Sequence, residues 1–119
     1  MNHSDVGILL YRKDYDKWLS DIEKFVPRIE EVERFKDFIT KDAEIRIGFL
    51  ENDEKFIFLQ WKDVPWNDLE FPYVTIIETV RKNGEFLRIG EEISDIVHEG
   101  YGDFEDTYLL GVSRNIVLN

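Results

Sequence analysis

The hydrophobic residues of the first third of the chain follow two spacings in turn. A short apolar run, Gly7–Arg12, predicts a strand, and Asp14 shortly after it is a candidate helix cap. Apolar residues then recur every three or four positions as far as Thr40, which predicts helices with one buried face. Pro27 interrupts the pattern, and because proline fits the first turn of a helix, we expect it to begin a second helix. One kinked helix is the alternative.

The next segment has the patterns of two strands: residues 44–49 alternate between apolar and polar positions, and residues 55–61 are rich in strand-forming residues. Residues 44–49 and 55–61, EIRIGF and KFIFLQW, flank the turn sequence ENDE and predict a β-hairpin. The second of these strands is apolar on both faces, so we expect it to lie in the interior of the sheet. Two prolines and several turn residues in Asp63–Pro72 predict a loop after the hairpin.

Two segments of the second half fit either a helix or a strand. Tyr73–Lys82 has apolar residues at helical spacing, and Asn83-Gly84 is then a candidate C-cap. The β-branched run VTII in the same segment favours a strand that turns at Asn83-Gly84 instead. Pro72 before the segment and two basic residues near its end favour the helix. The segment Glu91–Glu99 is ambiguous in the same way.

The remaining segments complete an α+β pattern. Residues 85–92 predict a strand, residues 100–106 a loop or short turn, and residues 107–118 one last strand. The order of elements is therefore β-α-α-β-β-α-β-β, in a single domain that spans residues 1–119. We expect an α+β fold with a mostly antiparallel sheet of about five strands and helices on one face. A ferredoxin-like (split βαβ) plan with an added strand fits this order.

The composition is that of a folded, strongly acidic protein. Hydrophobic residues make up 43% of the chain, which is enough to build a core. The 26 acidic residues outnumber the 15 basic ones, and the formal net charge is −11. This charge repels phosphate backbones and anionic lipids, so we expect neither direct nucleic-acid binding nor membrane binding. It would attract a basic protein partner and accelerate the encounter.

The sequence also bears on location. The apolar run near the N-terminus is too short for a signal peptide, and no apolar run approaches the length of a membrane span. The chain has no cysteine, which fits a reducing compartment. We therefore expect a cytoplasmic protein.

The residue types needed for catalysis or metal binding are scarce. The chain has two histidines, His3 and His98, and no cysteine, so we expect no zinc or transition-metal site. The acidic segment EGYGDFEDTY lacks the ligand spacing of a calcium loop. Ser94 and His98 stand four positions apart beside Asp95, but a catalytic triad also needs an oxyanion hole and an acid on the far side of the imidazole. We predict no catalytic residues, no metal site, no cofactor and no enzymatic activity.

The segment from Glu91 to Asp106 has seven carboxylates and no lysine or arginine. Aromatic residues lie between the carboxylates, and aromatic side chains supply much of the binding energy in protein interfaces. The carboxylates would pair with lysine or arginine of a partner. We therefore predict a partner-binding surface here, together with the tryptophan of the loop that contains the two prolines. The predicted contacts are Glu91, Glu92, Asp95, Glu99, Tyr101, Asp103, Phe104, Glu105, Asp106 and Trp66.

These features lead to one functional hypothesis and two alternatives. The leading hypothesis is a small acidic protein that neutralises a basic protein partner, such as an immunity protein to a toxin nuclease or a phage-encoded inhibitor of a defence nuclease. Nucleases bind phosphate and therefore present basic clefts that an acidic domain can cover. The first alternative is a non-catalytic assembly or regulatory module that forms a homodimer or docks through a sheet edge. The second is a domain that binds a small ligand or a metal.

Overall fold

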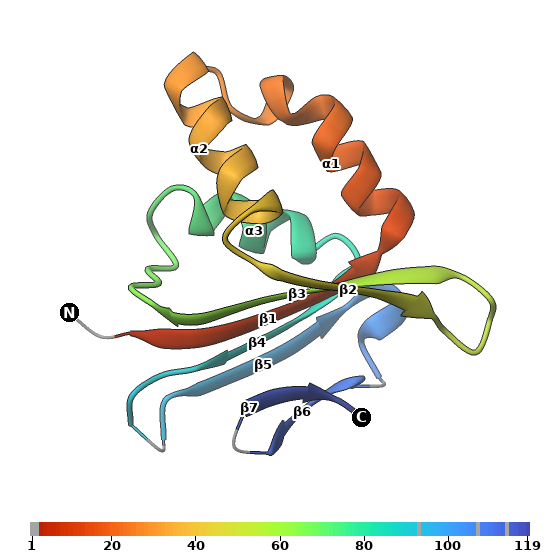
Figure 1. The fold of residues 1–119 in the computed structure, drawn as a ribbon. Coiled ribbons are helices and arrows are strands. Elements are labelled where there is room, and N and C mark those ends of the chain that lie inside the picture. The colour runs from red at the N-terminus through yellow and green to blue at the C-terminus, as the bar shows by residue number, and fades with distance from the viewer. Residues whose placement is uncertain (1–2, 93, 107, 114) are drawn as a thin grey trace.

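A five-stranded antiparallel sheet lies between three helices and a small β-hairpin (Figure 1). The computed structural model describes residues 3–92, 94–106, 108–113 and 115–119. Helices α1, α2 and α3 cover one face of the sheet, and the hairpin of β6 and β7 packs on the other face. The elements are β1 (Ser4–Tyr11), α1 (Arg12–Phe25), α2 (Ile29–Thr40), β2 (Glu44–Phe49), β3 (Lys55–Val64), α3 (Tyr73–Val80), β4 (Gly84–Ile89), β5 (Ile96–Tyr101), the short 3-10 helix η1 (Gly102–Phe104), β6 (Leu110–Ser113) and β7 (Asn115–Leu118).

The strand order in the sheet is β2-β3-β1-β4-β5, and every neighbouring pair is antiparallel. β1 is the central strand, since Ile8 lies opposite both Leu59 of β3 and Phe86 of β4. The predicted α+β class, with an antiparallel sheet and helices on one of its faces, is confirmed. The ferredoxin-like plan stays a prediction. β2 and β5 are the two edge strands, so each has one side without a neighbouring strand of this sheet.

The alternation of side chains along β1 divides the core into two clusters. Ile8 and Leu10 belong to the larger cluster on the helix side, together with Trp18 of α1. Leu9 belongs to the smaller cluster on the opposite face, where it packs with Ile116 of the hairpin. Because consecutive side chains of a strand point to opposite faces, one strand that is buried from Val6 to Tyr11 supplies both layers of the core.

Two separate helices occupy the long helical region, so the prediction of two helices rather than one kinked helix is confirmed. The prediction that Pro27 begins the second helix is wrong, because α2 begins at Ile29 and Pro27 lies in the connection before it. Val26 has extended backbone, since the residue before a proline avoids the helical region. The predicted cap at Asp14 is also wrong: Tyr11 at the end of β1 is the N-cap, and it makes no side-chain cap bond.

Helix α3 confirms the helical alternative for the segment that follows Pro72, although it ends at Val80. The predicted C-cap at Asn83-Gly84 is wrong, because the C-cap is Arg81 and Gly84 is the first residue of β4. Gly84 allows close packing on β1: a Cβ atom there would lie 2.7 Å from Cδ2 of Leu10. None of the helices in the described part of the chain has the length and apolar character needed to cross a membrane.

The C-terminal third of the chain differs most from the prediction. The ambiguous segment Glu91–Glu99 ends in strand β5, while Ile93 within it lies outside the described residues. The single last strand predicted for residues 107–118 is wrong, because β6 and β7 pair as a hairpin; Thr107 and Arg114 of that segment lie outside the described residues. Leu110 and Ile116 would lie about 20 Å apart in one extended strand. The hairpin instead packs both onto the apolar face of the sheet.

Candidate functional site

The predicted contact residues do not form one patch, because β5 separates them into two groups. Glu91, Glu92 and Asp95 precede β5, whereas Asp103, Glu105 and Asp106 follow it. A strand of this length spans about 20 Å. Glu99 and Tyr101 lie within β5, where the Tyr101 hydroxyl donates a hydrogen bond to the Glu99 carboxylate. The two ends of the sheet therefore have to be considered as separate surfaces.

Two of the predicted contacts, Phe104 and Trp66, have buried side chains. Phe104 is 3% exposed and packs against the ring of Tyr11, with 5.0 Å between the ring centroids. Trp66 is 7% exposed and belongs to the core on the helix side, where its ring lies 4.7 Å from that of Tyr73. Both rings therefore contribute to the core, where burial of large aromatic side chains is favourable, and their contact with a partner stays a prediction.

The carboxylate of Asp95, before β5, is engaged in a contact within the protein. Nη1 of Arg88 lies 3.2 Å from both carboxylate oxygens of Asp95, and the Arg88 side chain is only 15% exposed. Arg88 also lies within 3.9 Å of Asp68. Glu91 accepts a hydrogen bond from the backbone N–H of His3. At this end a partly buried arginine neutralises part of the acidic charge.

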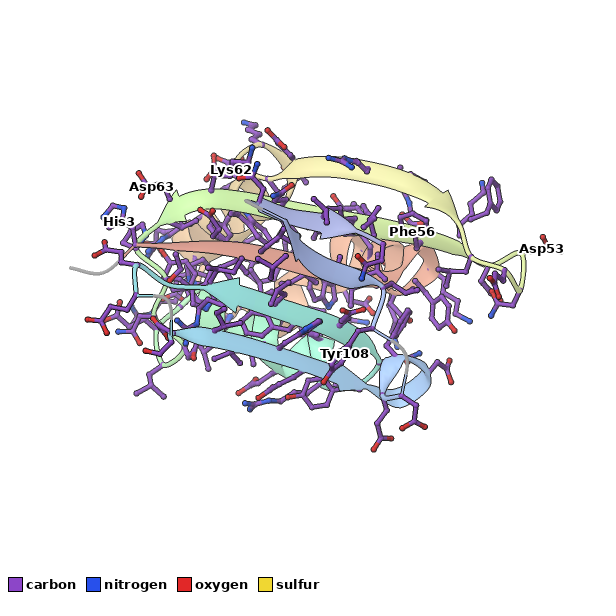
Figure 2. The ribbon with its side chains drawn as sticks, turned by 90° about the horizontal axis from the view of Figure 1, so that it is seen from below. His3, Asp53, Phe56, Lys62, Asp63 and Tyr108 are labelled. Atoms are coloured by element: carbon purple, nitrogen blue, oxygen red, sulfur yellow. The ribbon has the colours of Figure 1, made fainter. Side chains whose placement is uncertain are left out.

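The other end of the sheet carries a groove of about 690 Å³ on the face opposite the helices. It lies between the β2–β3 turn and the C-terminal hairpin, and Figure 2 shows this face with Asp53 at the tip of the turn and Phe56 at the start of β3. The volume falls in the range of pockets that bind ligands or side chains of partners. The groove has an apolar floor with polar groups at its rim. The floor is formed by Leu9, Phe56, Phe104, Leu109 and Leu118, and the rim includes Glu51, Asn52 and Asp103.

Asp103 is held in place at the rim by three hydrogen bonds. The Tyr11 hydroxyl donates to Oδ2 of Asp103 at 3.0 Å, and Nδ2 of Asn83 donates to the same oxygen at 3.4 Å. The backbone N–H of Asp103 donates to Oδ1 of Asn83 at 2.9 Å. Gly102 before it has a φ of 62°, a left-handed conformation that suits glycine. The Asp103 carboxylate is thus a fixed, charged acceptor beside an apolar floor.

Several carboxylates gather around Tyr11 and repel one another. Burial raises the pKa of the Asp14 carboxyl above its usual range; Lys13 and Lys17 oppose this shift, and the negative charges of Asp103 and Glu54 add to it. Burial also raises the pKa of Tyr11, and its hydrogen bond to Asp103 adds to the rise. The ammonium of Lys13 lies 3.8 Å from Glu54. The three carboxylates outnumber these two lysines, so the potential beside Tyr11 is negative.

A buried carboxylate that sequence reasoning missed connects the hairpin to the sheet. Glu85 of β4 is fully buried, and it accepts hydrogen bonds from the backbone N–H of Leu109 at 2.7 Å and of Leu110 at 3.0 Å. Nε2 of His98 lies 2.6 Å from the same carboxylate. The ring of Tyr108 stacks on His98, with 3.8 Å between the centroids. These contacts fix Leu109, which lines the groove.

The contacts of His98 show how Ser94, Asp95 and His98, the residues considered as a catalytic triad, are arranged. The carboxylate beside His98 is that of Glu85, on the neighbouring strand, whereas Asp95 pairs with Arg88. Ser94, His98 and Asp95 are therefore not assembled as a triad. Among the described residues, no three His, Cys, Asp or Glu side chains lie together in an arrangement that could hold a metal ion.

No protein-family model matches this chain, and the searches of curated proteins and of solved structures find no match. The groove therefore has to be interpreted from its own chemistry. Sequence reasoning found Asp103 but missed Tyr11, Asp14 and Glu51, because they come from the first half of the chain. The available signal was the acidic turn ENDE between Phe49 and Phe56, which predicted a hairpin turn and nothing further.

Proposed function

We propose that the protein binds and neutralises a basic protein partner, and that the partner docks at the acidic groove. The observation that carries the proposal is the placement of the Glu51 and Asp103 carboxylates at the rim of an apolar groove. A lysine or arginine side chain matches such a site, since its methylene stem packs on an apolar floor while its charged end reaches a carboxylate.

The charge distribution supports the same partner chemistry. Asp14, Glu54 and Asp103 repel one another close to Tyr11, which lines the groove with Asp103, so a cation from outside would relieve that repulsion. The net charge of −11 would also steer a basic protein toward this surface from a distance. An arginine is the favoured occupant, because its planar guanidinium makes paired hydrogen bonds with a carboxylate.

The partner class that we propose is a phosphate-binding enzyme, such as a toxin nuclease or a defence nuclease. The clefts of such enzymes are basic, and carboxylates around a groove can occupy the positions that phosphates would take. In this proposal the protein acts in the cytoplasm as an immunity protein or as a phage-encoded inhibitor, by covering the cleft of its target.

Two matched charge-reversal variants test the proposal. Glu51→Lys with Glu105→Lys alters the groove end, and Glu91→Lys with Glu92→Lys alters the opposite end by the same charge; all four glutamates are exposed. Each variant and the unaltered protein are immobilised and exposed to a lysate of the source organism. Bound proteins are then eluted in steps of increasing salt and identified by mass spectrometry.

We expect one basic protein to bind the unaltered protein and the Glu91/Glu92 variant, to elute with salt, and to be absent from the groove variant. Equal retention on both variants would show that the partner docks elsewhere. A retained protein that is not basic and resists high salt would contradict the proposal that charge directs the binding.

A further inference from the structure

The two edges of the sheet differ in how they are protected. At β5, the hydroxyl of Tyr108 donates a hydrogen bond to the carbonyl oxygen of His98 at 3.2 Å. The carbonyl of Phe104 lies so close to Gly100 that a Cβ atom there would collide with it. The chain after β5 therefore covers part of this edge. Natural sheets commonly protect their edges in this way against pairing with another chain.

The edge at β2 has no such cover. No residue of Glu44–Phe49 is buried, and its apolar side chains are among the most exposed of the described residues: Ile45 is 39% exposed, Ile47 55% and Phe49 67%. These three side chains alternate with Glu44 and Arg46, so they share one face of the strand. Within the described residues, the backbone of β2 makes no hydrogen bond outside its pairing with β3. The segment contains no proline and no bulge, two of the devices that prevent edge pairing.

We infer that this edge pairs with the same edge of a second copy of the chain. The two β2 strands would run antiparallel, with Ile47 opposite Ile47 of the second copy at the two-fold axis. Ile45 then lies opposite Phe49 of the second copy, and the same pairing is repeated on the other side of the axis. This register brings all the exposed apolar side chains of the strand together, and cross-strand pairs of aromatic and β-branched residues are favourable.

The other face of β2 is complementary in the same register. Arg46 would lie opposite Gly48 of the second copy, which has no side chain to obstruct it. The ring of Phe56 extends over Gly48, since a Cβ atom there would lie 2.6 Å from ring carbons of Phe56. Arg46 already lies over the ring of Phe58 in its own chain, at 5.8 Å from the centroid. In the pair, its guanidinium would lie between two aromatic rings, an arrangement that arginine favours.

Charge also favours a second copy at this edge rather than at other surfaces of the protein. Glu44 and Arg46 cancel, so β2 is neutral within a chain of net charge −11. Two copies therefore meet with little local repulsion at this strand. The two-fold axis would be perpendicular to the sheet. Both helix layers would therefore lie on one side of the joined sheet and both acidic grooves on the other. This pairing does not depend on the proposed binding of a basic partner.

Cysteine cross-linking tests the register directly, because the chain has no cysteine of its own. Opposite side chains in an antiparallel pair have Cβ atoms about 5 Å apart. In this register Ile45 and its counterpart in the second copy are four positions apart along the strand, or about 13 Å. A bifunctional thiol reagent shorter than about 13 Å therefore links cysteines at opposite positions but not two cysteines at position 45.

We expect the reagent to cross-link Ile47→Cys into a dimer without a second variant present. Ile45→Cys alone should form no cross-link with the reagent, whereas a mixture of Ile45→Cys and Phe49→Cys should cross-link. Ile96→Cys, on the opposite edge strand, should not cross-link. Cross-linking of Ile45→Cys or Ile96→Cys alone, or none with Ile47→Cys, would overturn the inferred pairing.

Sedimentation measurements on a second pair of variants keep the test independent of the reagent. Ile47→Glu and Ile96→Glu make the same substitution at exposed positions of the two edge strands, 55% and 46% exposed. By sedimentation, we expect the unaltered protein and Ile96→Glu to be dimers and Ile47→Glu to be a monomer. Circular dichroism should show that the Ile47→Glu monomer is folded. A monomeric unaltered protein, or dissociation by Ile96→Glu instead, would overturn the inference.

Discussion

The Tyr11 hydroxyl lies 3.0 Å from Oδ2 of Asp103 and donates a hydrogen bond to it. This bond joins the end of the central strand to the 3-10 helix that follows β5, two segments separated by more than 90 positions of sequence. It places a carboxylate at the rim of the apolar groove, where a cationic side chain of a partner would find it. The bond therefore connects the stability of the fold with its proposed function.

Removing the Tyr11 hydroxyl should change how stability responds to alkaline pH. Burial, followed by the hydrogen bond to Asp103, raises the pKa of Tyr11 in the folded state above the unfolded value of about 10. Its contribution to the free energy of unfolding is therefore fully present below that pH and decreases as the pH rises through the folded-state pKa. Tyr11→Phe should cost about 0.5–1.5 kcal/mol at neutral pH and lose stability less steeply in alkali. Urea denaturation over a pH series measures both effects, and parallel alkaline curves for the two proteins would contradict the prediction.

Glu85 should be among the most sensitive polar positions. Glu85→Gln removes a fully buried carboxylate that accepts hydrogen bonds from two backbone N–H groups of the segment leading into β6. We expect a loss of about 1–3 kcal/mol in the free energy of unfolding, because an amide is a weaker acceptor than a carboxylate. Glu78→Gln, on the exposed side of α3, is the control and should change it by less than about 0.5 kcal/mol. Similar denaturation midpoints for both variants would show that Glu85 does not secure the hairpin.

Two glycines predict opposite responses to an added methyl group. A Cβ atom at Gly100 would collide with the backbone carbonyl of Phe104, whereas the atoms nearest to one at Gly111 belong to the side chain of Asn119, which can move aside. Gly100→Ala should therefore cost about 1–3 kcal/mol, and Gly111→Ala much less. Thermal unfolding of the two variants tests the close approach of η1 to β5, and an undisturbed Gly100→Ala variant would argue against it.

Trp66, a predicted contact residue, tests how much its packing in the core stabilises the fold. Trp66→Ala should lower the free energy of unfolding by about 3–5 kcal/mol, because its buried ring packs among other aromatic rings of the core. Leu69→Ala in the same loop should change it by less than about 0.5 kcal/mol, since Leu69 is 88% exposed. If Trp66→Ala unfolded like the unaltered protein, the tryptophan would have to be available at the surface.

The sequence allowed the sheet strands and the helices to be predicted because their patterns are regular. Helical spacing placed α1 and α2, alternation placed β2, and a run of strand-forming residues placed β3. The errors occurred where tertiary packing decides: Gly84 packs against β1 instead of ending a helix, and the last apolar run folds back to cover the sheet. The local spacing of residues predicts neither the packing of Gly84 nor the hairpin.

The candidate site was harder to predict because it is assembled across the chain. The acidic segment that drew attention in the sequence is divided by β5, and only its second part borders the groove. Asp14 and Glu51 contribute to the groove end from other elements, and a single sequence does not show that they meet Asp103. Glu85 looked like an ordinary polar position of a strand, although the hairpin buries it.

The central claim is that the groove recognises basic side chains on an apolar floor. It is tested most directly by NMR, with isotope-labelled protein titrated with a short, capped peptide in which arginine and leucine alternate. We expect chemical-shift changes at Tyr11, Glu51, Asn52 and Asp103 that disappear in high salt and in the Glu51→Lys, Glu105→Lys variant. Shift changes centred on Glu91 and Glu92, or changes that persist in that variant, would contradict the account.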